Sequence, residues 1–230
     1  MTDAMASRLS GPILVFAPHP DDEVLGAGGL LAEQSKRGAR VHIVHVTDGE
    51  FDGRAIERRR VQARDAAECL GVAEVEFLGF ATRLLRHESE LLGRLRDVVV
   101  RVRPAVLLLP HAQESDQDHA AVHLAGREAA FVATSTMVAN PAPAVRLILG
   151  YEVWSPINRP PLVLPFGTKA AGCKAAAAAA YMGEIERLGI AKAAGGLATY
   201  RGCMFAGSEQ AEAFTIEHCS VDLPSLILEL

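Results

Sequence analysis

The chain has 230 residues, half of them hydrophobic, and carries a formal net charge of −5. This length fits one large α/β domain, or one domain with an extension, and the apolar content predicts a substantial core rather than long disorder. The negative balance, with 58–60 as the one dense basic run, argues against a protein that binds nucleic acid.

The cysteines and the amino-terminal residues bear on the cellular setting. The cysteines are widely spaced and form no C-x-x-C pair, which argues against a thiolate zinc site and a disulfide framework. Residues 1–10 lack the charged segment and apolar core of a secretion signal. No apolar run approaches the ~20 residues of a membrane span. We therefore expect a cytoplasmic protein with no transmembrane segment.

Apolar runs alternate with amphipathic segments through residues 1–134. Strands are expected at 13–17, 41–47, 75–78 and 105–109. Helices are expected at 24–37, 56–70, 90–103 and 119–133, the first three being followed by Gly38, Gly71 and Pro104. Strands separated by helices predict a mostly parallel sheet with right-handed crossovers, which is a Rossmann-like, doubly wound α/β fold.

The pattern loosens after residue 134. Here we expect a strand at 145–153, an irregular proline-rich connection at 156–165, an alanine-rich helix at 169–188, a loop at 195–207 and a short strand at 214–217. No internal repeat is present. The prediction is a single domain over 1–230, with a Rossmann-like core at 1–134 and an irregular C-terminal extension at 135–230 that completes the substrate pocket.

One imidazole and three carboxylates follow the first expected strand: His19, Asp21, Asp22 and Glu23. Burying this much charge is costly unless a cation compensates it. One turn can aim His19 and Asp22 at one point, whereas Asp21 points elsewhere and is free to handle a proton. Carboxylates in a first helical turn also meet the positive helix end. That simpler explanation suffices for any one residue, but not for all of them together.

A second polar cluster follows the fourth expected strand, with His111, Glu114, Asp116, Asp118 and His119. In a doubly wound sheet the first and fourth strands are neighbours at the switch point, where ligands bind. His19, Asp22 and His119 then form the set of two imidazoles and one carboxylate that suits a catalytic zinc.

Three further histidines are expected to play supporting parts. His123 lies four residues beyond His119 and is a rival ligand, but this pair lacks the glutamate that zinc-protease helices carry. His42 and His45 lie on opposite faces of the second strand and are expected to be structural.

These segments resemble the PIG-L/LmbE-like family of zinc-dependent N-deacetylases, of the N-acetylglucosaminyl de-N-acetylase type. The family's A-H-P-D-D-E motif is matched at 17–23, with Pro18 as an additional residue before the histidine. Its H-x-D-H motif is matched at 116–119. Weaker matches at 47–50, around Arg59 and at 151–154 extend the resemblance over nearly the whole chain.

The resemblance implies that His19, Asp22 and His119 bind Zn²⁺. It also implies that Asp21 is the general base for a water that attacks the acetamide carbonyl. Arg59 resembles a substrate-contacting arginine, although a surface residue in a basic run is a competing explanation. Glu50 and His111 join Arg59 as the candidate substrate-binding residues.

Two departures concern the second motif. Asp116 stands where the family has a histidine, and a carboxylate accepts hydrogen bonds unless it is protonated. Glu114 stands where some members have a tyrosine. Asp116 joins Asp21 as a candidate catalytic residue, with three alternatives open: His111 or His123 takes the histidine's role, Asp116 orients another group, or activity is reduced.

The sequence thus predicts a metal-dependent hydrolase that removes an N-acetyl group from an amino sugar of a glycoside, sugar nucleotide or lipid-linked sugar. The partner would be a small-molecule amino-sugar conjugate, and a homo-oligomer is possible. The alternative is a zinc amidase for a non-sugar acylamine. A receiver module is disfavoured because no aspartate ends the third strand. Gly26, Gly28 and Gly29 do not form a dinucleotide-binding G-x-G-x-x-G motif.

Overall fold

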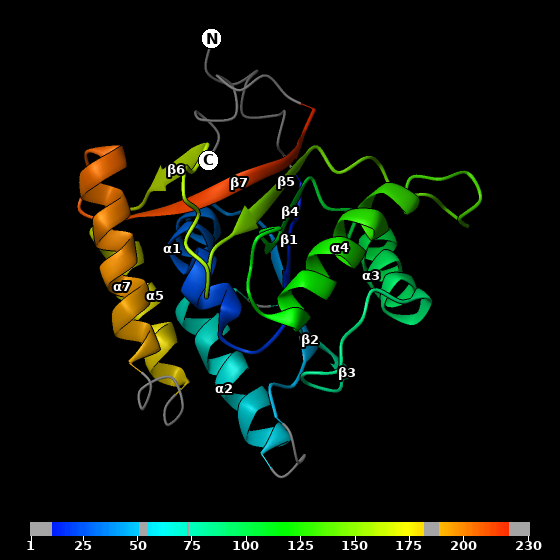
Figure 1. The fold of residues 1–230 in the computed structure, drawn as a ribbon, viewed down its shortest axis with the longest axis horizontal. Coiled ribbons are helices and arrows are strands. Elements are labelled where there is room, and N and C mark those ends of the chain that lie inside the picture. The colour runs from blue at the N-terminus through cyan, green and yellow to red at the C-terminus, as the bar shows by residue number, and fades with distance from the viewer. Residues whose placement is uncertain (1–10, 51–54, 73, 182–188, 221–230) are drawn as a thin grey trace.

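The computed structural model describes residues 11–50, 55–72, 74–181 and 189–220. Within them one sheet has the strand order β3-β2-β1-β4-β5-β7-β6 (Figure 1). The strands are β1 (Ile13–Ala17), β2 (Val41–Thr47), β3 (Glu74–Phe80), β4 (Val106–Pro110), β5 (Leu147–Tyr151), β6 (Leu162–Pro165) and β7 (Ala211–Cys219). Neighbours from β3 to β5 are parallel, whereas β7 runs antiparallel to both β5 and β6.

Helices cover both faces of this sheet, with α1, α2, α5 and α7 on one face and α3 and α4 on the other (Figure 1). Their bounds are α1 (Asp22–Lys36), α2 (Ile56–Cys69), α3 (Ser89–Val102), α4 (Gln117–Val132), α5 (Thr168–Ala180) and α7 (Ile190–Arg201). No helix among the described residues is long and apolar enough to cross a membrane.

Strand β1 lies at the centre of the core because both of its faces are covered. Its side chains alternate between two apolar clusters: Ile13 and Val15 pack in the layer of α1 and α2, and Leu14 and Phe16 in the layer of α3 and α4. This explains why the strand is an uninterrupted apolar run rather than an alternating one.

The glycines of α1 allow the helix to pack closely against its neighbours. A Cβ on Gly26 would lie 2.4 Å from the ring of Tyr151, and one on Gly29 would lie 2.4 Å from the ring of Phe166. Their placement in the sequence therefore reflects packing between α1 and the elements that cover it.

The predicted α/β fold is confirmed, and the differences lie in the C-terminal part. The expected loop at 195–207 is wrong: residues up to Arg201 belong to α7, and Gly202–Ala206 form a π-helical turn. Packing of α7 against α5 and β7 outweighs the low helix propensity of its glycines. The proline-rich connection contains β6, an edge strand where prolines are tolerated. The expected helix at 169–188 ends at Ala180, and 182–188 lie outside the described residues.

Candidate metal centre

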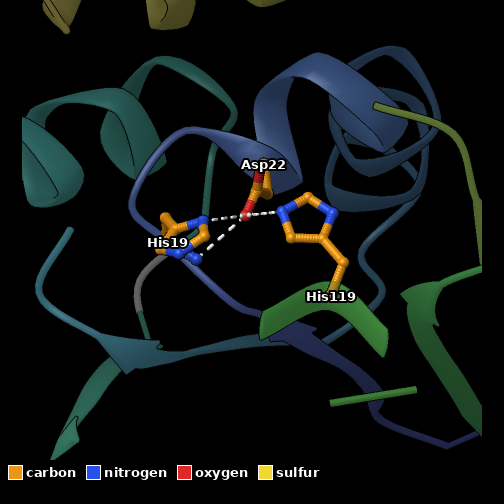
Figure 2. A group of neighbouring side chains, drawn as sticks. All are labelled: His19, Asp22 and His119. Carbon is orange, nitrogen blue, oxygen red and sulfur yellow. Dashed lines mark hydrogen bonds and ion pairs between the residues drawn. The ribbon is translucent and has the colours of Figure 1, made fainter. Parts of the chain in front are cut away.

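The carboxyl ends of β1 and β4 are adjacent, since β1 pairs in parallel with β4. The segment after β1 carries His19 and leads into α1, whose first residue is Asp22. The first turn of α4, which follows β4, carries His119. One ligand-type atom from each of these three side chains lies within 4.8 Å of the others (Figure 2). The structure thus brings together the three residues that the sequence predicted as metal ligands.

Asp22 is the centre of this group. Its Oδ2 lies 3.3 Å from Nδ1 of His19 and 3.1 Å from Nε2 of His119 (Figure 2). His119 is fully buried, yet neither of its ring nitrogens has a hydrogen-bond partner among the described residues, because the approach to Asp22 lacks hydrogen-bond geometry. A buried, unsatisfied imidazole nitrogen facing a carboxylate is what a bound cation would satisfy. The three residues therefore fit a metal ion.

The second ring nitrogen of each histidine faces another carboxylate. Nε2 of His19 lies 3.0 Å from Oδ2 of Asp118, and Nδ1 of His119 lies 3.5 Å from Oε2 of Glu114. Metal-binding histidines characteristically direct their second nitrogen at such a partner, which fixes the tautomer and the ring orientation. The arrangement leaves Nδ1 of His19 and Nε2 of His119 for a metal.

A second group, formed by His19, Asp116 and Asp118, also has ligand-type atoms within 4.8 Å of one another. Its carboxylates are already occupied by protein donors. Asp118 accepts the backbone N–H groups of Arg83 at 2.6 Å and Leu85 at 3.2 Å. Asp116 accepts the backbone N–H of Asp118 at 2.8 Å as the N-cap of α4 and forms an ion pair with the Arg83 guanidinium. Asp22, by comparison, accepts one backbone N–H among the described residues, that of His19 at 2.9 Å. Because fewer donors occupy its carboxylate, the group around Asp22 is the better metal centre.

Asp21 adopts a rare backbone conformation, with φ of 124° at the N-cap of α1. Such geometry in a non-glycine residue costs on the order of 1–3 kcal/mol and is often found at functional sites. Burial, followed by the charge of Asp22, raises the pKa of Asp21 to about 8, against the opposing effect of Arg59. Asp21 is thus a carboxyl group that can bind and release a proton close to the candidate metal ligands.

Arg59 lies beneath this segment and is only 5% exposed, so it is not the surface residue that its basic run suggested. Its Nη2 donates to the carbonyl of Pro20 at 2.8 Å and lies 3.4 Å from Oδ2 of Asp21. Its Nε lies 3.9 Å from Oε1 of Glu50, and its guanidinium lies 5.5 Å from the ring centroid of Tyr181. Of the predicted substrate-binding residues, Arg59 therefore lies next to Asp21, and Glu50 lies next to Arg59.

His111 is buried, and its Nε2 lies 3.4 Å from Oε1 of Glu114. Its Nε2 donates to the carbonyl of Ser155 at 2.7 Å, and its Nδ1 accepts the Gln113 backbone N–H at 3.2 Å. Both ring nitrogens thus have partners within the protein. His123 lies 2.8 Å from the carbonyl of Pro110 through Nδ1, in line with the supporting part expected for it.

The electrostatics around the two imidazoles favour a positive charge. Burial lowers the pKa of both rings, but Asp118 and Asp22 outweigh it at His19 and raise its pKa to about 9. At His119, Asp22 and Glu114 outweigh burial and raise the pKa to about 10. Burial alone would raise the pKa of Asp22, but His119 and His19 outweigh it and hold this pKa below its ordinary range. Such a site stabilises a cation in a place from which water is largely excluded.

Three residues to which sequence reasoning gave no role contribute to the site, although Glu114 was among the residues expected there. Glu114 faces His119, and Arg83 pairs with Asp116. The Tyr181 hydroxyl donates to Oε1 of Glu23 at 2.6 Å. Only Glu114 carried a signal, since it replaces a tyrosine of the resembled family. Arg83 and Tyr181 lie far from both motifs in the sequence.

Known proteins resemble this chain in sequence and in fold. Residues 14–130 match the family model described as PIG-L: GlcNAc-PI de-N-acetylase. The uncharacterized deacetylase YaiS of Escherichia coli is 31% identical over 146 residues, which are 61% of this chain and 72% of that protein. Diacetylchitobiose deacetylase of Thermococcus kodakarensis is 29% identical over 130 residues, 51% of this chain and 48% of that protein. The chain thus matches about half of the length of this relative.

Solved structures share the fold over most of the chain. Protein TT1542 from Thermus thermophilus has a TM-score of 0.84 at 26% identity and covers 93% of this chain and 98% of its own. The hydratase GalB of Pseudomonas putida has a TM-score of 0.79 at 23% identity, and the match covers 92% of this chain and 98% of GalB. These likenesses concern the fold, whereas the family model spans just over half of the sequence and shows that the chain belongs to the PIG-L family.

Proposed function

We propose that the chain is a zinc-dependent N-deacetylase that hydrolyses the N-acetyl group of a GlcNAc-type amino sugar in the cytoplasm. The observation that carries the proposal is the group of His19, Asp22 and His119, in which Asp22 and His119 are buried, with Asp21 beside it. Support also comes from the amino-sugar substrates named for relatives such as diacetylchitobiose deacetylase and a probable N-acetyl-alpha-D-glucosaminyl L-malate deacetylase of Bacillus cereus.

His19, Asp22 and His119 would hold the metal. A bound zinc would supply Lewis acidity toward a carbonyl oxygen and would make a water more acidic. In the proposed reaction Asp21 accepts the proton of the attacking water and delivers it to the departing amine nitrogen, so that the products are acetate and the free amino sugar. Arg59 keeps the Asp21 segment in place through Pro20.

Asp116 has a different task in this proposal. Of the alternatives that the sequence left open, orientation of another group has the best support, because Asp116 caps α4 and pairs with Arg83. Glu50 and Arg59 remain the proposed substrate contacts. His111 was a third candidate, but its two occupied ring nitrogens favour a place behind Glu114 rather than against the substrate.

A second candidate function is hydration of an unsaturated carboxylic acid. The observation in its favour is the relative named 4-oxalmesaconate hydratase, from Pseudomonas putida, which is 33% identical over 135 residues, covering 52% of each protein. A water made nucleophilic at a metal centre could serve either reaction. Substrate tests must therefore separate them.

The deciding experiment measures amine release from four derivatives of N-acetylglucosamine: the free sugar, a glycoside, a nucleotide-linked sugar and a lipid-linked sugar. We expect release from at least one of them, its loss with a chelator and its recovery with added zinc. Asp21→Asn should lower the rate by about 10²- to 10⁴-fold, the usual contribution of a general base.

No release from a zinc-loaded enzyme would refute the sugar-deacetylase proposal. Parallel assays with non-sugar acylamines and with an unsaturated dicarboxylate would then decide between an amidase and a hydratase.

A further inference from the structure

Glu114 is a buried carboxylate held by an unusual number of backbone donors. Its Oε1 accepts the N–H groups of Val153 at 2.7 Å, Trp154 at 3.1 Å and Ser155 at 3.3 Å. Its Oε2 also lies 3.1 Å from the Trp154 nitrogen. These residues follow β5, so Glu114 connects the loop before α4 to the 153–155 segment. A carboxylate with this many donors has little freedom to turn.

The fixed carboxylate faces one of the candidate metal ligands. Its Oε2 lies 3.5 Å from Nδ1 of His119, and both side chains have no exposed surface. The other ring nitrogen, Nε2, lies 3.1 Å from Asp22. A histidine that binds a metal through Nε2 carries its proton on Nδ1, where a carboxylate can accept it.

We infer that Glu114 is a positioning residue that holds the His119 ring with Nε2 toward the metal. The inference rests on the proposed function only in that His119 serves as a metal ligand. It assigns Glu114 no part in proton transfer to the substrate. Glu114 also connects this metal ligand to the 153–155 segment, because it accepts the backbone N–H of Trp154, whose side chain is half exposed.

A role in orienting His111 alone does not explain the position of Glu114. Nε2 of His111 lies 3.4 Å from Oε1 of Glu114, but it has a closer acceptor in the Ser155 carbonyl at 2.7 Å. Nδ1 of His119 has no hydrogen-bond partner in the described part of the chain, and Glu114 is the carboxylate that it faces. His119 is thus the histidine whose orientation depends on Glu114.

The test compares Glu114→Gln with the wild-type enzyme in its affinity for zinc, measured by competition with a chromogenic chelator. Glutamine keeps the shape and one acceptor oxygen but cannot offer a charged acceptor to both the backbone donors and His119. We expect zinc affinity to fall about 10- to 100-fold, as is usual when the outer partner of a metal ligand is lost.

Glu212→Gln is the matched control. Glu212 is also buried, and it accepts the backbone N–H groups of Gly29 at 2.8 Å and Leu30 at 2.9 Å and pairs with Lys174. It lies on β7, and these partners are not proposed metal ligands. This variant should keep the zinc affinity of the wild type within about twofold, even where its thermal stability drops.

An equal zinc affinity of Glu114→Gln and the wild type would overturn the inference and leave the proposed function intact. If the wild type binds no zinc, both fail. Should Glu114→Gln not fold, long-range ¹H–¹⁵N spectra of the zinc-loaded wild type decide the matter. They should show the proton of His119 on Nδ1 and the metal on Nε2, and the reverse assignment would refute the inference.

Discussion

Arg59 and Asp21 are 38 residues apart, yet Nη2 of Arg59 lies 3.4 Å from Oδ2 of Asp21. The same nitrogen donates to the carbonyl of Pro20 at 2.8 Å. Helix α2 therefore holds the segment in which Asp21 adopts its rare backbone conformation. The arginine is buried, so these contacts are little screened by solvent.

Arg59→Met should lower kcat by about 10- to 100-fold, because a small displacement of a catalytic carboxylate is enough to cause such a loss. Zinc content should stay unchanged. Arg58→Met, at an exposed neighbouring position, serves as the control and should behave like the wild type. Steady-state kinetics on the substrate identified by amine release separate the two parts proposed for Arg59. A fall in kcat reports the positioning of Asp21, whereas a rise in KM with unchanged kcat would show that Arg59 acts through substrate binding alone.

Zinc should stabilise the folded protein, because its ligands come together only in the native state. At a free zinc concentration 100 times the dissociation constant, the gain is about 2.7 kcal/mol. For a chain of this size that raises Tm by about 5 to 10 °C over the chelator-treated protein. Thermal unfolding followed by circular dichroism measures the shift. His119→Gln, which removes one proposed ligand, should show almost none, and an equal shift in this variant would exclude His119 as a ligand.

Asp116 is expected to matter for stability through its capping contact with Asp118. Asp116→Ala should lower the free energy of unfolding by about 0.5–2 kcal/mol, the usual cost of losing an N-cap. Asp116→Asn keeps a capping oxygen and should stay close to the wild type in urea denaturation. If both variants retain stability but lose activity, the carboxylate acts in the reaction itself.

Gly29→Ala should destabilise the protein by about 1–3 kcal/mol, since the added methyl group would overlap the ring of Phe166. Gly172, an exposed glycine in α5, provides the matched control, because a methyl group added there would have open space around it within the described part of the chain. Gly172→Ala should stabilise by about 0.5–1 kcal/mol through helix propensity alone. Equal effects of the two changes in urea denaturation would show that α1 does not require the close contact.

Much of this site could be predicted because it depends on local spacing and on the order of parallel strands. His19 and Asp22 share one turn after β1, and the β1–β4 neighbourhood brings His119 to them. Amphipathic periodicity likewise placed most helices of the first half. The role of His19, Asp22 and His119 as metal ligands stays a prediction.

Other features depend on contacts between distant parts of the chain, which no local pattern encodes. Helix α7 forms despite Gly195 and Gly196 because it packs against α5 and β7. Strand β7 inserts antiparallel between β5 and β6, an order that periodicity does not specify. Glu114 meets backbone donors about 40 positions later, so its residue type is visible in the sequence but its partners are not.

The place of β7 in the sheet sets an order for biosynthesis. Among the described strands β6 pairs with β7 alone, and β7 is the last of them to leave the ribosome. Until 211–219 emerge, β6 therefore lacks its strand partner. The connection before it is held at its start, by β5 and by Glu114, but not at β6. The three proposed metal ligands are all made by residue 119. A nascent chain therefore carries the proposed metal ligands long before β7 can complete the sheet.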